Sequence, residues 1–177
     1  ENAMWWLLLD ETNNGFKPSK YTSFNTRYDK LNTPHSAGYI AYRESRCIIV
    51  AKGFGETQFV NKKPVHYHDM VAESGGLVLG GLYREWQHQQ TGQTTLSCSV
   101  ITLPPHPKLK DIHSKAMPLI LPQSENVIDD WLNPTEHNVE KFDGLLTPHI
   151  PQSIIAQQVD KPSFHNPISN HLLISKD

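Results

Sequence analysis

Three long apolar runs rich in β-branched residues constrain the fold of this chain more than any other feature of its sequence. They occupy residues 46–51, 77–83 and 94–103. β-branched and aromatic side chains favour pleated strands, and turn-forming residues border these runs at Gly53, Gly75-Gly76 and Pro104-Pro105. Within the second run, Gly80-Gly81 predicts a bulge or a close approach of the backbone. The sequence therefore predicts a fold dominated by strands.

Shorter segments add further strands to this expectation. A strand after Gly53 would continue the first run through residues 56–60, and residues 65–70 alternate as a half-buried strand does. Residues 4–9 form a short apolar burst that predicts a buried strand, and residues 24–28 predict a brief extended piece.

Helices are expected to be few and small. Residues 126–132 are the best candidate, because their apolar side chains form one stripe, with Ser124 as a cap and Pro134 as a stop. Shorter helices are predicted near residues 38–44 and 139–146, and the polar last thirty residues are expected to wrap the surface. The predicted fold class is α+β: a curled or barrel-like, mixed or antiparallel sheet with small peripheral helices.

Size and charge narrow the classes of function. A chain of 177 residues suits a single domain over residues 1–177. The net charge of −2 is unevenly spread, with a balance of +3 over residues 1–63 and −5 over residues 64–177. The basic part could face phosphates, although scattered solvated charges explain the same counts. No apolar run reaches the roughly 18 residues of a membrane span and no secretory signal is visible, which predicts a cytoplasmic protein without a membrane partner.

The two cysteines are predicted to be structural. Cys47 and Cys98 both lie in apolar or small-residue segments that read as strands, where cysteine usually behaves as a small buried hydrophobe. Two free thiols fit a cytosolic protein better than a disulfide framework does.

Asn25-Thr26-Arg27 is the first candidate site. Two residues that are two apart on an extended segment face the same side, so Asn25 could orient a bound group while Arg27 holds a phosphate or carboxylate. Spacing alone favours the alternative, a turn-forming asparagine and a solvent-exposed arginine.

Two further candidates carry acid/base groups. Glu56 follows Gly53-Phe54-Gly55 behind an apolar strand, and partial burial there would raise its pKa toward neutrality. His113 stands before a loop that ends at Pro118, where an imidazole could act as general acid or base. An exposed edge glutamate and one surface histidine among ten are the alternatives.

His66 and His68 are a candidate half-site for zinc. Both imidazoles would lie on one face of a strand, but no third ligand stands at a fitting spacing and no C-x-x-C pairing accompanies them. We therefore predict no metal and no cofactor.

Taken in order, these segments resemble the SRAP family (SOS-response-associated peptidase). The resemblance runs from about residue 5 to residue 135 and rests on Trp6-Leu7, Asn25 to Asp29, Arg46 to Glu56, Gly80 to Trp86, Ile101 to Leu103, Ile112 to Pro118 and Trp131-Leu132. No single motif is decisive, but their order is specific.

The resemblance implies a sensor that crosslinks to abasic sites in single-stranded DNA during the DNA-damage and SOS response. In the family, an N-terminal cysteine exposed by autoproteolytic removal of a leader attacks the ring-opened aldehyde through its amine, and its thiol closes a thiazolidine. By position, Glu56 resembles the glutamate of ring opening and leader cleavage, His113 the acid/base histidine, and Asn25 the residue that holds the cysteine. Arg27, Trp6 and Lys115 resemble residues that contact DNA.

Several departures accompany the resemblance. Thr57 stands where the family has an aromatic residue, Asp29 replaces a glutamate, and the loop after His113 is one residue longer. The family's start with its cysteine is missing from this chain, so we expect Glu1 to be internal and the leading segment to be absent. The fragment by itself is expected to be inactive.

Two other functions fit the same residues. One is a peptidase acting on other proteins, for which a cysteine, a glutamate and a histidine would suffice. The other is a module that binds single-stranded DNA without a covalent step.

Overall fold

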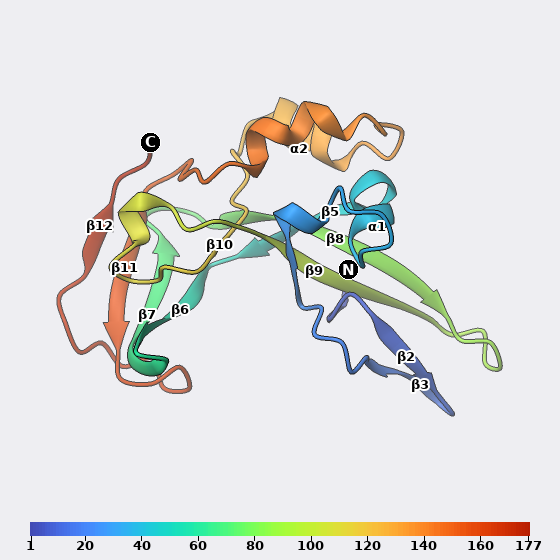
Figure 1. The fold of residues 1–177 in the computed structure, drawn as a ribbon, viewed down its shortest axis with the longest axis horizontal. Helices are drawn as coiled ribbons and strands as arrows, with labels where there is room; N and C mark the ends of the chain where they lie inside the picture. The colour runs from blue at the N-terminus through green and yellow to red at the C-terminus, as the bar shows by residue number, and fades with distance from the viewer.

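The computed structural model describes all 177 residues and consists mainly of strands (Figure 1). Two short α-helices and three 3₁₀ helices accompany them, none of which is long and apolar enough to cross a membrane. These helices are α1 (Tyr39–Glu44), α2 (Glu125–Leu132), η1 (Tyr28–Lys30), η2 (Pro107–Leu109) and η3 (Val139–Leu146). The predicted strand-dominated α+β class is confirmed, with open mixed and antiparallel sheets in place of a closed barrel.

The first sheet is organised around β9 (Thr94–Leu103). It has the order β1-β9-β8-β5, and β4 and β10 also pair with β9. β1 and β4 run parallel to β9, whereas β8 and β10 run antiparallel to it, so the sheet is mixed. The other members are β1 (Met4–Trp5), β4 (Asn25–Arg27), β5 (Arg46–Ala51), β8 (Leu77–Gln87) and β10 (Met117–Pro118).

The second sheet is antiparallel, with the order β12-β11-β7-β6. Its strands are β6 (Gly53–Val60), β7 (Lys63–Ala72), β11 (Ile154–Val159) and β12 (Leu172–Ile174). Only Lys52 separates β5 from β6, so one bent segment forms an edge of both sheets. A Cβ at Gly53 would collide with the backbone carbonyl of Met70, and the bend therefore requires glycine.

A small hairpin, β2 (Leu9–Thr12) and β3 (Gly15–Pro18), projects from the rest of the molecule (Figure 1). The sequence did not predict it, because residues 10–18 are polar. The predicted strand over residues 4–9 is wrong in extent, since it stops at Trp5. Ser23 accounts for the break: its carbonyl accepts the amide of Leu7 at 3.0 Å, and its hydroxyl accepts the amide of Leu8 at 2.9 Å.

The two glycines in β8 mark a close approach and not a bulge. Pairing with β5 continues through Gly80 and Gly81, and pairing with β9 begins at Gly81, both without a register shift. A Cβ at Gly80 would lie 2.5 Å from Cδ2 of Leu119, so the chain before α2 packs directly on the strand.

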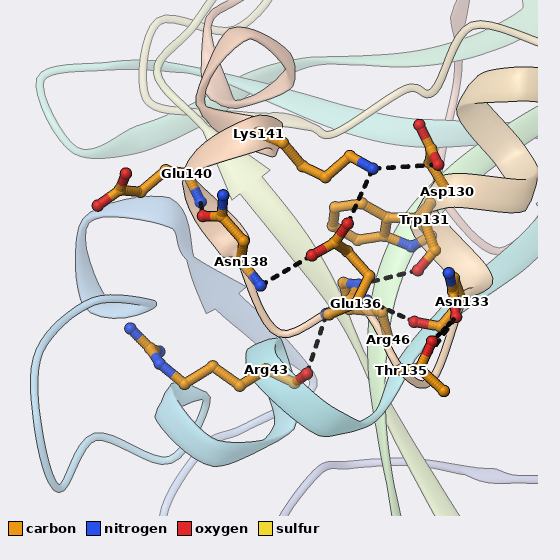
Figure 2. Close-up of polar contacts among 10 residues, drawn as sticks. All are labelled: Arg43, Arg46, Asp130, Trp131, Asn133, Thr135, Glu136, Asn138, Glu140 and Lys141. Atoms are coloured by element: carbon orange, nitrogen blue, oxygen red, sulfur yellow. Dashed lines mark hydrogen bonds and ion pairs between the residues drawn. The ribbon is translucent and has the colours of Figure 1, made fainter.

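The helices are tied to the first sheet through one buried arginine, shown in Figure 2. Arg46 is 7% exposed, and its guanidinium donates only to backbone carbonyl oxygens. Its bonds are 2.8–3.1 Å long and reach Tyr42, Arg43, Trp131, Asn133 and Glu136. The ring of Trp131 is fully buried between Tyr42 and Phe142, so a charged group and an aromatic cluster together fix α2 over β5.

Candidate functional site

A cleft of about 1260 Å³ opens where the two sheets meet. Its walls come from β5, the start of β6, alternate residues of β9, the first residues of the chain and the segment before β10. Most of the lining is apolar, and three of its few polar side chains are Asn25, Glu56 and His113. A large apolar cleft with a few convergent polar groups is the common form of a ligand site.

Glu56 lies on β6, three residues beyond the bend at Gly53. Its side chain is 18% exposed, and burial raises the pKa of its carboxyl group to about 7. A carboxyl group with this pKa can both give and take a proton near neutral pH. The sequence analysis made a raised pKa conditional on partial burial, with an exposed edge glutamate as the alternative, and the side chain is largely buried.

His113 reaches Glu56 from the loop that follows η2. Its Nδ1 lies 2.9 Å from the carbonyl oxygen of Thr57 and 3.1 Å from Oε2 of Glu56. Because a carbonyl oxygen only accepts, Nδ1 carries the hydrogen, and the Nε2 of the neutral ring keeps its lone pair. The backbone of β6 therefore fixes the tautomer in which Nε2 can serve as a base.

β4 brings the first predicted group to the same region. Asn25 and Arg27 are both exposed, whereas Thr26 between them is buried and hydrogen-bonded to Ser99 at 2.8 Å. Asn25 lines the cleft. Arg27 lies outside the lining and forms an exposed ion pair with Asp29 at 2.8 Å, which a phosphate could replace at little cost.

The other two predicted DNA contacts lie away from the cleft lining. The indole of Trp6 is half-buried and donates to the carbonyl groups of Ser19 and Tyr21, both at 3.1 Å. Lys115 is exposed and holds its ammonium 4.4 Å from the ring centre of Phe59. The neighbouring Trp5, which the sequence analysis did not single out, is 59% exposed and lines the cleft.

The cysteines and the histidine pair have other surroundings. Cys47 and Cys98 line the cleft as free thiols, and burial raises the pKa of Cys47 to about 12 and also raises that of Cys98. The rings of His66 and His68 lie 6.4 Å apart, and no third histidine, cysteine or carboxylate joins them as a metal ligand.

Fold and site together define a class: a strand-dominated α+β protein with a glutamate and histidine in contact in a large cleft. Solved proteins from two bacteria are among those that share this fold. A protein from Bacteroides thetaiotaomicron matches with a TM-score of 0.66 at 21% identity, covering 78% of this chain and 59% of its own. One from Bordetella bronchiseptica matches with a TM-score of 0.65 at 21% identity, covering 81% and 68%.

The sequence model of the family described as SOS response associated peptidase (SRAP) matches residues 1–162, and this chain belongs to that family. It is 32% identical over 115 residues to the abasic site processing protein YoaM of Bacillus subtilis (strain 168), which covers 64% of this chain and 49% of that protein. It is also 29% identical over 150 residues to the abasic site processing protein HMCES of Xenopus tropicalis, covering 74% and 44%. The chain thus spans about half the length of these relatives.

Proposed function

We propose that the protein containing this chain forms a covalent link to abasic sites in single-stranded DNA, and that Glu56 and His113 supply the proton transfers. The observation that carries this proposal is the 3.1 Å contact between the two side chains in the cleft, with the carboxyl pKa at about 7. The names of the relatives, abasic site processing proteins, give the substrate class. We also propose that the protein is cytoplasmic, where it would meet this DNA.

The proposed reaction joins an α-amine to the aldehyde of a ring-opened abasic sugar. Addition gives a carbinolamine, loss of water gives an imine, and addition of a thiol to the imine closes a thiazolidine. An α-amine has a pKa of about 8, so part of it is neutral and nucleophilic near pH 7. We place both groups on an N-terminal cysteine outside residues 1–177, as the family resemblance implies.

In this proposal each of the two side chains has a distinct task. Protonated Glu56 can deliver its proton to the ring oxygen as the sugar opens, and to the hydroxyl group that leaves as water. Neutral His113, with its Nε2 lone pair free, can take a proton from the attacking amine. In the same proposal, Glu56 assists the autoproteolytic removal of a leader peptide, which also needs a proton at the leaving amine.

The remaining predicted residues would position the reactants. Asn25 lines the cleft, where its amide could hold the terminal cysteine. Arg27 could exchange its exposed ion pair with Asp29 for a DNA phosphate, and Lys115 and Trp6 would make further contacts with DNA.

Neither Cys47 nor Cys98 fits the role of the nucleophile in this reaction. Both lie inside strands, where no free α-amine accompanies the thiol, and burial raises the pKa of both thiols. A thiol kept protonated in this way reacts slowly.

The test incubates the full-length natural protein with an oligonucleotide that carries one abasic site. The proposal predicts a denaturation-resistant adduct whose mass equals protein plus DNA minus one water. Intact DNA recovered after denaturation would overturn the covalent step and leave non-covalent binding. Turnover of an unrelated peptide that is lost in Glu56→Gln would favour the peptidase alternative.

A further inference from the structure

The β6–β7 hairpin extends beyond the Glu56–His113 contact and carries features that the reaction above does not use. Asn61 and Lys62 form its turn, with φ of 51° and 65°, between the paired residues Val60 and Lys63. Two consecutive residues with positive φ define the tight type I′ turn, which matches the twist of its strands. Lys62 and Lys63 therefore stand exposed on a short, well-defined tip, at the lower left of Figure 1.

An aromatic ring lies between this tip and the site. Phe59 is 42% exposed, and the ammonium group of Lys115 lies 4.4 Å from its ring centre. The segments that bring Lys115 to Phe59 are the ones that bring His113 to Glu56. Phe59 follows Glu56 by three residues, which is about 10 Å along a strand. A register shift between Gln58 and Phe59 interrupts the regular alternation of faces, and one loop contacts both side chains through His113 and Lys115.

The positive charges on the hairpin and beside its aromatic ring are unpaired. The lysines that form ion pairs in this chain are Lys108 and Lys141, and neither belongs to the hairpin. Asp69, the acidic residue of β7, is paired with His165 at 2.8 Å. One unpaired ammonium group beside an exposed aromatic ring and two more at the hairpin tip contrast with a chain whose net charge is −2.

We propose that Phe59, Lys62, Lys63 and Lys115, here called the hairpin surface, bind the nucleotides that flank the abasic position in single-stranded DNA. The ammonium groups would neutralise phosphates, and a base next to the abasic position would stack on Phe59. Since Thr57 offers no ring, Phe59 is the aromatic residue of β6 beyond Glu56. The proposal rests on the proposed function for the choice of DNA, but it requires no covalent chemistry.

The experiment measures equilibrium binding by fluorescence anisotropy. The probe is a labelled single-stranded oligonucleotide with a central tetrahydrofuran abasic analogue, which has no aldehyde and cannot crosslink. We expect Phe59→Ala to weaken binding about tenfold, the size typical of one lost stacking contact. Lys62→Gln/Lys63→Gln should lower the slope of log affinity against log salt by about 1.4, or about 0.7 for each lost phosphate contact.

Control variants and shortened probes show whether a change in binding comes from the hairpin surface. Lys176→Gln removes an exposed charge at the other end of the second sheet and should leave both affinity and slope unchanged. Phe59→Leu keeps an apolar side chain without the ring and should behave as Phe59→Ala. If the nucleotides that would contact the hairpin are removed from the oligonucleotide, the wild type and the hairpin variants should bind it with equal affinity. If the nucleotides on the other side of the abasic analogue are removed instead, the variants should still bind more weakly than the wild type.

Wild-type affinity in the Phe59 and double-lysine variants, with unchanged thermal melting, would overturn the proposal. Equal dependence on Lys62 and Lys63 for binding a polyglutamate peptide or anionic vesicles would also overturn it, because the surface would then be a general anion site. A protein that binds the analogue through the hairpin but forms no adduct with a true abasic site would contradict the proposed function alone.

Discussion

Replacing Glu56 with glutamine should remove a pH dependence of stability that the buried carboxyl group creates. Burial raises the pKa of this group from 4.5 to about 7 in the folded chain, whereas in the unfolded chain the carboxyl is solvated. The side chain is only 18% exposed, so the shift reflects real desolvation. Glutamine has nearly the same shape and stays neutral at every pH.

The sign and size follow from linkage. Below pH 4.5 the carboxyl is protonated in both states, and its contribution to stability is complete. Between 4.5 and about 7 the unfolded state ionises first, so stability falls as pH rises, and above 7 the loss is constant. A shift from 4.5 to about 7 corresponds to a loss of about 3 kcal/mol. Glu56→Gln should therefore gain about 3 kcal/mol relative to wild type between pH 4 and pH 8.

Urea unfolding of wild type and Glu56→Gln at a series of pH values measures the difference in their free energies of unfolding. The contributions of the other titrating groups are common to both proteins and cancel in this difference. Glu140→Gln, which removes an exposed carboxylate on η3, serves as the control and should stay within about 0.5 kcal/mol of wild type. A constant difference between wild type and Glu56→Gln from pH 4 to pH 8 would refute the assignment of a buried, neutral carboxyl group.

Three further changes test other parts of the structure. Arg46→Met should lower the free energy of unfolding by about 3 kcal/mol or more in urea titration, because several carbonyl groups lose their donor, and Arg46→Lys should recover only part of this. Gly80→Ala should cost about 1–3 kcal/mol in the same assay because of the 2.5 Å approach to Leu119, whereas Gly144→Ala, which meets nothing, should be nearly neutral. Cys47, with a pKa raised from 9.0 to about 12, should be alkylated at pH 8 about a thousandfold more slowly in the native chain than in urea, as followed by mass spectrometry.

The strands that could be predicted are those whose own residues favour them. β5 and β9 occupy the predicted residues, because β-branched and apolar side chains favour a strand before any partner is known. β8 also forms where expected, but it continues to Gln87, beyond the predicted end at Tyr83.

Other strands depend on distant partners. The expectation that the last thirty residues wrap the surface missed β11 and β12. β11 forms because β7 offers its edge, and β12 then pairs with β11. In the same way, η3 follows the predicted range 139–146 but winds as a 3₁₀ helix around the buried Phe142. Tertiary contacts determine the secondary structure of such segments, so it cannot be predicted from their local composition.

The candidate site also has residues that the local sequence could identify and contacts that only the tertiary structure reveals. Glu56 could be singled out because two glycines precede it, and Asn25 and Arg27 because alternation places them on one face. Nothing in the spacing joins Glu56 to His113, since their contact depends on the loop after η2 lying along β6. The family resemblance brought these residues together before the structure did, whereas Trp5 and Phe59 emerged only from exposure and contact.

The rate of adduct formation with a single-stranded abasic oligonucleotide tests the central claim most directly. The natural full-length protein would be compared with its Glu56→Gln and His113→Gln variants, and with Glu140→Gln as the control. General acid/base catalysis by the pair predicts a rate lower by about 10²–10⁴ for each site variant, with binding of the tetrahydrofuran analogue unchanged. Adduct formation at the wild-type rate in Glu56→Gln and His113→Gln would contradict the claim that this contact drives the chemistry.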